Sequence, residues 1–258
     1  MLTTVLLIAL VIFLSTQFSA LSTTIYLHRT MAHKGIRLHP FIASLMKVQL
    51  WVFTGIVVRE WVAVHRKHHH FSDVEGDPHS PHLKGLWNVL LWNAVYYAKE
   101  ANKPDVVEKY TRDMPATRPD IVLSNGWMGL ATGMAVFIAG FTLWFGGWIG
   151  PVVGAAAFVA QGVYYIISNA VINGACHVIG YKNFKNTATN IKAVAWLTAG
   201  EGLHNNHHQY PAAAKMSMRR GEFDPAWPFI WLMSKLRLAT PLPLPNENEN
   251  SLGYAQAQ

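Results

Sequence analysis

Two long runs of the chain carry no charged side chain, and they constrain what it can fold into. Residues 1–27 and 121–181 contain no Asp, Glu, Lys or Arg. Each run exceeds the roughly 20 apolar residues that a helix needs to cross a bilayer. Only 14% of the 258 residues are charged, against about 25% in soluble proteins. The sequence therefore predicts an all-α integral membrane protein.

Three transmembrane helices are expected from these runs. The first run has no Lys or Arg before Arg29, unlike a secretory leader with its basic start. The second run is long enough for two spans, and the glycines and proline of residues 146–151 mark a turn between them. The predicted spans are about 2–26, 121–145 and 149–171. Outside them, we expect an amphipathic helix over residues 86–100.

Eight histidines fall in three compact clusters, in residues 28–33, 65–69 and 204–208. Helical residues three and four apart share a face, so the second and third clusters can each direct three ring nitrogens to one point. His28 and His33 are five apart, about 140° around an α-helix axis. They are expected to converge poorly on one ion, but could serve two ions or straddle a helix end. Asn173 and His177, four apart, add a further pair of candidate ligands.

This concentration of imidazoles indicates metal binding. Buried imidazoles without partners would be costly, and imidazole suits Zn, Cu, Fe and Ni. The ligands outnumber what one ion uses, which favours two ions, although spacing alone does not exclude zinc or copper. The isolated histidines are interpreted as ordinary polar residues: His39, His70, His79 and His82. The single cysteine, Cys176, is predicted to be buried beside His177.

Residues 40–58 pose a topological choice. The segment is apolar but contains Lys47 and Gln49. If it crossed the membrane, the first two histidine clusters would lie on opposite faces and could not share a site. We therefore predict a re-entrant or interfacial helix. All histidine clusters then lie in a helical cap on one face, and the positive-inside rule places that face in the cytoplasm.

The order and spacing of these motifs resemble those of membrane fatty-acyl desaturases of the stearoyl-CoA desaturase type. That family carries H-R-x3-H, H-R-x-H-H and H-x2-H-H boxes and an N-x3-H element after its last span, and all four occur here in order. Flanking residues agree as well, including Asp77-Pro78-His79 after the second box and Gly200-Glu201-Gly202 before the third. The similarity extends from about Thr24 to Asp224.

The resemblance implies a di-iron centre and O2-dependent insertion of a cis double bond into a fatty-acyl chain. The implied ligands are nine histidines, with Asn173 reaching a metal through water: His28, His33, His65, His68, His69, His177, His204, His207 and His208. Asp73, Asp77 and Glu201 are candidate carboxylates that hold the imidazole tautomers. Two electrons must come from a separate donor protein of ferredoxin, rubredoxin or cytochrome b5 type with its reductase.

The chain departs from the family at two places. Only one span precedes the first box, so lipid or another subunit is expected in place of the missing one. Family members that use coenzyme A often have charged residues directly before the second box, where this chain has Trp61-Val62-Ala63-Val64. A lipid-linked acyl group or an acyl-carrier protein thioester therefore becomes more plausible. Lys67, Lys84, Arg219 and Arg220 remain candidates for attracting an anionic head group.

These observations predict a single membrane desaturase domain over residues 1–240 and a disordered tail over 241–258. We expect the bacterial inner membrane, with the site on the cytoplasmic face. The net charge of +7 lies outside the charge-free runs, which favours a membrane surface over nucleic acid as its partner. Two alternatives stay open: a histidine-rich hydroxylase or ketolase acting on an alkane, lipid or carotenoid, and a metal transporter or storage protein.

Overall fold

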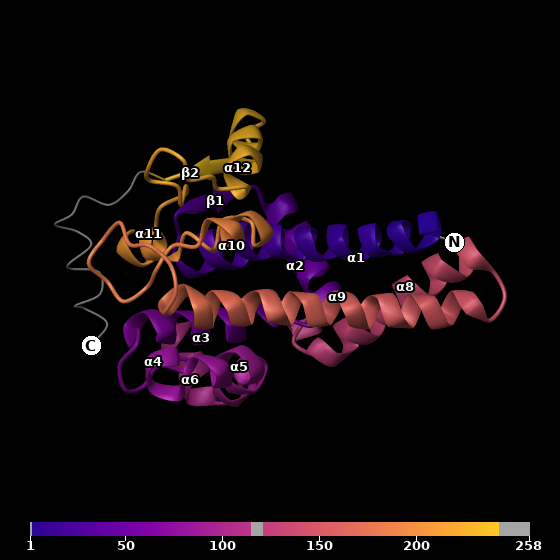
Figure 1. The fold of residues 1–258 in the computed structure, drawn as a ribbon, viewed down its shortest axis with the longest axis horizontal. Coiled ribbons are helices and arrows are strands. Elements are labelled where there is room, and N and C mark those ends of the chain that lie inside the picture. Colours follow the sequence, from indigo (N-terminus) through magenta and orange to yellow (C-terminus); the bar gives the residue numbers. More distant parts are fainter. Residues whose placement is uncertain (1, 115–120, 243–258) are drawn as a thin grey trace.

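The computed structural model describes residues 2–114 and 121–242. Figure 1 shows long helices that extend from the N-terminal end of the molecule, while most shorter helices and the strands gather at the opposite end. The elements in order are α1 (Leu2–Ser22), η1 (Thr23–Ala32), β1 (Ile36–Leu38), α2 (Pro40–Thr54), α3 (Val58–His70), α4 (Pro81–Lys84), α5 (Leu86–Ala101), α6 (Pro104–Tyr110), α8 (Gly126–Phe145), α9 (Ile149–Gly174), η2 (Ala175–His177), α10 (Lys192–Leu197), α11 (His204–Gln209), α12 (Ala226–Lys235) and β2 (Ala239–Pro241).

Within residues 2–114 and 121–242, three helical stretches are long and apolar enough to span a membrane, as predicted. They are Leu2–Ala32, Gly126–Phe145 and Ile149–His177. The first and third continue beyond the predicted limits, so that each carries candidate ligands on its last turns. The second stretch begins at Gly126 rather than at residue 121. Asn125 is its N-cap residue, and the Asn125 side chain accepts a hydrogen bond from the N–H of Met128.

The α8–α9 hairpin follows from the glycine-rich turn predicted between its helices. Gly146 and Gly147 both adopt positive φ angles, 68° and 49°, which glycine reaches without steric cost. The returning helix α9 packs on α8 through Phe137, Phe141 and Phe158. This hairpin brings the end of α9 back to the end of the molecule that carries the histidines.

The segment predicted to be re-entrant is a bent helix pair. Helix α2 ends at Thr54, and α3 starts at Val58 in a direction 88° away from it. Gly55 makes the bend possible with a φ of 67°. At the start of α2, the backbone N–H of His39 donates to the carbonyl of Leu238 in the chain leading to β2. The helix pair therefore begins and ends at the end of the molecule that carries the strands and the histidines.

The cap joins residues 36–38 to the C-terminal part of the described chain. Strand β1 pairs antiparallel with β2, a small sheet that the all-helical prediction did not contain. The core beneath it combines Ile25, Leu50, Val62 and Ile230 from four different helices. The tail predicted to be disordered from residue 241 is paired at its start, because the N–H of Leu242 donates to Gly35. Residues 243–258 lie outside the described residues.

Candidate metal centre

The first histidine cluster lies on a π-helix, η1, which continues α1. In a π-helix the backbone hydrogen bonds join residues five apart, and the N–H of His33 donates to the carbonyl of His28 at 3.1 Å. The two rings consequently lie on the same face, with centroids 5.0 Å apart. The expectation of poor convergence was wrong, because it assumed α-helical geometry.

The second cluster occupies the last turns of α3, as its i, i+3 and i+4 spacing predicted. His65 and His69 face the π-helix, and His33 Nε2 lies 2.8 Å from His65 Nε2. His68 turns the other way, toward His208, with 3.4 Å between the Nε2 atoms. Helix α3 thus supplies histidines to two different groups. The expectation that the second and third clusters each direct three ring nitrogens to one point was wrong, because His207 separates in the same way from His204 and His208.

The third cluster forms the short helix α11, which asparagines hold in place. The side-chain oxygen of Asn190 accepts the N–H groups of Asn205 and Asn206 at 3.0 and 3.3 Å, and so caps the first turn. The Asn206 amide donates to Met216 O and Glu222 Oε2. These contacts explain the two asparagines between the histidines, a role that the spacing did not reveal.

The structure brings all nine predicted histidines into two groups. Within each group, one potential ligand atom from each residue lies within 4.8 Å of those from the others. The first group is His28, His33, His65, His69 and His207, and the second is His68, His177, His204 and His208. Cys176 is buried next to His177, as predicted, and belongs to neither group.

Each predicted carboxylate contacts a different histidine of these groups. The Nδ1–H of His28 donates to Glu201 at 2.7 Å, that of His68 to Asp77 at 3.0 Å, and that of His177 to Asp73 at 2.7 Å. A ring that donates through Nδ1 keeps a lone pair on Nε2. All three Nε2 atoms point at another histidine, 2.9 to 3.4 Å away.

The electrostatics of the site favour neutral rings and ionised carboxylates. Burial holds the pKa of His204, His207 and His208 well below the ordinary 6.5, and neighbouring imidazoles lower it further. Burial by itself would raise the pKa of Asp77, but the hydrogen bond from His68 and the attraction of that ring lower it to about 2. Neutral buried imidazoles with inward lone pairs are the form that binds a metal cation.

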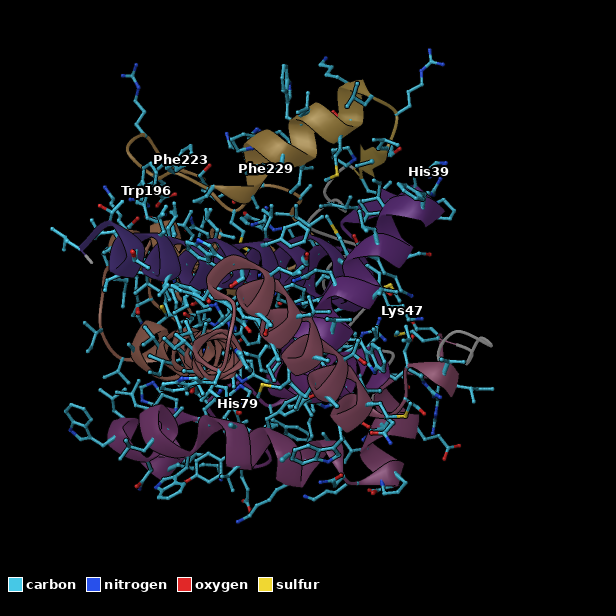
Figure 2. The ribbon with its side chains drawn as sticks, turned by 90° about the vertical axis from the view of Figure 1, so that its right-hand side faces the viewer. His39, Lys47, His79, Trp196, Phe223 and Phe229 are labelled. Carbon is cyan, nitrogen blue, oxygen red and sulfur yellow. The ribbon has the colours of Figure 1, made fainter. Side chains whose placement is uncertain are left out.

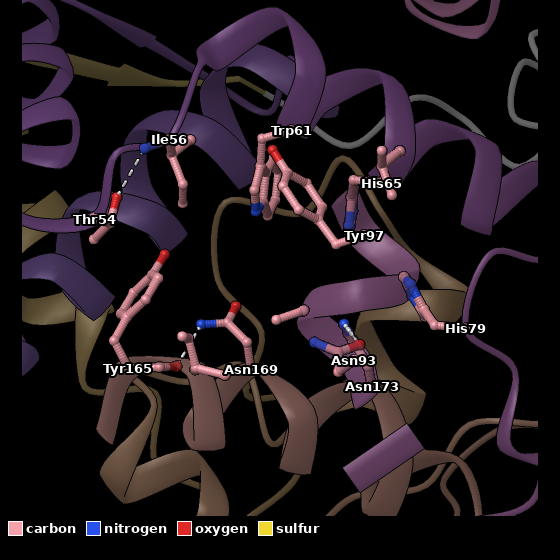
Figure 3. Close-up of a pocket in the computed structure, with 13 residues that line it drawn as sticks. Thr54, Ile56, Trp61, His65, His79, Asn93, Tyr97, Tyr165, Asn169 and Asn173 are labelled. Atoms are coloured by element: carbon pink, nitrogen blue, oxygen red, sulfur yellow. Dashed lines mark hydrogen bonds between the residues drawn. The ribbon is translucent and has the colours of Figure 1, made fainter. Parts of the chain in front are cut away.

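A cavity of about 230 Å³ adjoins the groups. Figure 3 shows Trp61 and His65 on one side of it and Asn169 and Asn173 on the other. Asn173 lines this cavity, and its amide donates to Asn93 at 3.1 Å. Trp61 lines this cavity, and its ring stacks on His65.

His79 is a site residue that the sequence interpretation missed. It had been read as an ordinary polar residue like His39, but His79 is 4% exposed and lies among the helices, whereas His39 lies at the outer edge (Figure 2). Its ring stacks on His68 and lines the cavity. Neither ring nitrogen has a hydrogen-bond partner within the described ranges. The available signal was that Asp77-Pro78-His79 follows the second box as in the family that the chain resembles.

A second missed feature is the arginine that follows the first histidine. Arg29 is 1% exposed and donates to both Asp224 oxygens, at 2.7 and 3.0 Å. Its Nε also donates to Thr24 at 3.1 Å, and Thr24 in turn donates to Glu201. The buried ion pair is thereby linked to the carboxylate that holds His28.

The fold and site define a helical membrane protein with a histidine-rich candidate metal centre at one end. The model of the fatty acid desaturase family matches residues 3–231, and the chain belongs to that family. It is 29% identical to a hex-5-enoyl-(acyl-carrier protein) acetylenase of Moorena producens (strain JHB), over 85% of this chain and 72% of that protein.

Two further relatives carry desaturase names. The chain is 30% identical to the delta-9 desaturase-like 3 protein of Arabidopsis thaliana, over 85% of this chain and 71% of that protein. It is also 30% identical to the sn-2 palmitoyl-lipid 9-desaturase of Nostoc sp. (strain 36), over 90% and 80%. The protein is accordingly an oxidoreductase of the fatty-acyl desaturase class, with membrane-spanning helices and histidine clusters compatible with a metal site.

Proposed function

We propose that the nine histidines bind two iron ions and that the protein introduces a cis double bond into a fatty-acyl chain with O2. The observation that carries the proposal is the set of three rings whose Nδ1 atoms are held by Glu201, Asp77 and Asp73 while their Nε2 atoms converge on other histidines. Carboxylates placed in this way orient metal-binding imidazoles and raise their basicity.

The proposal assigns one ion to each histidine group, with Asn173 reaching the second through water. The geometry fits such ions, since the Nε2 atoms of His28 and His177, whose Nδ1–H groups are held by carboxylates, each lie about 3 Å from a ring nitrogen of another histidine. Zinc has no redox chemistry, whereas the family's reaction is an oxidation. When bound, iron supplies the activation of O2. The protein itself orients the imidazoles through Asp73, Asp77 and Glu201.

The reaction balances with two electrons from outside. One saturated C–C pair loses two hydrogens, and O2 takes up these two hydrogens, two electrons and two protons to give two waters. The chain's own residues choose the C–C pair, because Trp61 and His65 form the part of the cavity wall beside the first group. Holding one carbon pair against the centre is the positional selection that such chemistry needs.

The acyl chain is proposed to enter the cavity from the membrane. Thr54, Tyr165 and Ile166 line both the cavity and a groove of about 530 Å³ between α8 and α9. The groove is walled by apolar side chains such as Leu130, Met134 and Val163. Val62, Ala63 and Val64 are buried and offer no charge for a nucleotide, which supports a lipid-linked acyl group over a coenzyme A thioester.

The electron donor is proposed to dock over a hollow of about 420 Å³ on the far side of the site. His69 and His208 line it together with Ser72 and Thr187, so one histidine of each group reaches this surface. Short paths from a docked redox protein to both ions would start here. The donor is a separate redox protein of ferredoxin, rubredoxin or cytochrome b5 type.

For topology, we propose that α1, α8 and α9 cross a bacterial inner membrane and that the α2–α3 pair turns back. The histidine-bearing cap then faces the cytoplasm and the N-terminus lies outside. An N-terminal epitope tag on intact cells is expected to be accessible to a membrane-impermeant probe, whereas a tag after residue 242 is expected to be labelled only after permeabilisation. The reverse labelling pattern would overturn the topology.

The activity is tested by expressing the chain in a bacterial host whose lipids lack double bonds. We expect mass spectrometry of the total fatty acids to show new cis-monounsaturated chains, dependent on O2. A host that carries the empty vector provides the control. A hydroxylated product without an alkene would contradict desaturation and favour the hydroxylase alternative.

A further inference from the structure

We propose that Arg66, between His65 and the paired histidines of α3, is a positioning residue that clamps the end of the π-helix. The clamp would fix His33 at bonding distance from the ion that His65 also binds. The clamp itself is a set of contacts within the protein. Only its consequence, the position of His33 relative to an ion, rests on the proposed two-metal centre. No other side chain in the described part of the chain joins the first two histidine clusters in this way.

The first half of the clamp acts on the π-helix. The Nε–H of Arg66 donates to the carbonyl of Ala32 at 3.0 Å, and an Nη2–H donates to the carbonyl of Met31 at 2.9 Å. The last carbonyls of a helix have no partner within the helix. Arg66 satisfies two of them directly before His33, at the point where the helix could otherwise unwind or change its register.

The second half of the clamp anchors the guanidinium itself. Nη1 donates to the carbonyl of Tyr110 at 2.9 Å and to Asp113 Oδ1 at 2.6 Å, and Nη2 donates to Asp113 Oδ2 at 3.1 Å. Asp113 also pairs with Lys34 at 2.6 Å. The residue directly after His33 is thus tied to the carboxylate that holds Arg66, so His33 is bracketed on both sides.

The clamp matters because π-helical register decides where His33 points. A change from π to α hydrogen bonding would rotate His33 away from His28, as the 140° separation on an α-helix implies. The present arrangement places His33 Nε2 at 2.8 Å from His65 Nε2. Since His65 is the neighbour of Arg66, the same helix segment supplies both the clamp and the histidine that His33 must meet.

Arginine is required for this geometry rather than any cation. Its planar fork presents five N–H donors in fixed directions, and Arg66 makes five contacts with four different residues. A lysine at this position has three donors on one atom and cannot reach two carbonyls of the π-helix and Asp113 together. Arg66→Lys is therefore expected to behave like Arg66→Gln rather than like the wild type.

The experiment compares the full-length chain with Arg66→Gln and Arg66→Lys in detergent micelles. Hydrogen–deuterium exchange of the metal-free protein is expected to rise about tenfold or more in residues 28–36 of both variants, and to remain unchanged in α9. Titration with Fe(II) is then expected to show one site with wild-type affinity and one weakened by about 10–100-fold. Arg59→Gln is the matched control, because Arg59 lies on the same helix but donates only to Thr111.

Unchanged exchange in residues 28–36 would overturn the clamp, and so would equal weakening of both iron sites or a uniform rise of exchange over the whole chain. A wild-type protein that binds fewer than two iron ions would instead contradict the proposed function. The exchange measurement still decides the clamp in that case, since it is made without metal.

Discussion

Replacing His207 by alanine is expected to abolish desaturation, with residual activity below about 1% of the wild type. His207 Nε2 lies 2.9 Å from that of His28 and 2.8 Å from that of His69, so this ring joins histidines from two other clusters. It is 1% exposed, and no solvent-borne ligand can readily replace it. Fatty-acid analysis and iron content of the purified variant measure the two effects.

His70→Ala provides the matched control for this loss. His70 follows the second cluster directly, stacks on Phe71 and lies outside both histidine groups. Its variant is expected to keep two iron ions and most of the activity. Full activity in the His207 variant, or an equal loss in both, would refute the assignment of His207 as a ligand.

Asp224→Ala is expected to cause the largest loss of stability of any single change outside the histidines. The carboxylate and Arg29 are both almost fully buried, and removal of one partner from such a pair leaves an uncompensated charge. The cost is about 3–5 kcal/mol, which corresponds to a fall of roughly 10 °C in the thermal midpoint of a chain of this length. Thermal unfolding of the detergent-solubilised protein measures it.

Two further variants distinguish the effect of an unpaired buried charge on the thermal midpoint from a nonspecific loss of stability. Glu108→Ala removes an exposed carboxylate and is expected to leave the midpoint unchanged. The double change Arg29→Met with Asp224→Leu replaces the pair by apolar groups and is expected to recover much of the loss, because such replacements are often neutral. A double variant no more stable than Asp224→Ala would show that the hydrogen bonds of Arg29 and Asp224, rather than the balance of their charges, stabilise this part of the fold.

The spans and the gathering of the histidines at one end of the molecule could be predicted because strong physical constraints act on them. A bilayer excludes charge, so residues 1–27 and 121–181 identified the long helices without any tertiary information. The requirement that distant histidines reach one site then predicted that residues 40–58 turn back. In the structure α2 and α3 are bent by 88° and His65 meets His33, while the return of this segment to the same membrane face stays a prediction.

The features that the sequence did not predict depend on contacts between residues that are far apart in the chain. The π-helical register at His28 is stabilised partly by Arg66, more than 30 residues later, and hydropathy carries no trace of it. Likewise, Arg29 gave no signal that it would be buried against Asp224. The spacing of His79 after Asp77 was visible in the sequence, but its burial beside His68 is a product of tertiary folding.

The proposed entry of the acyl chain through the groove between α8 and α9 would make the physical state of the bilayer part of the catalytic cycle. Because Tyr165 and Ile166 border both the groove and the inner cavity, a saturated chain can slide sideways out of the hydrocarbon layer and its product can return by the same path. The supply of saturated substrate is then governed by the lateral diffusion of lipids and by the order of their acyl chains. Turnover should fall steeply when the surrounding lipids freeze into a gel, and each double bond made delays that freezing.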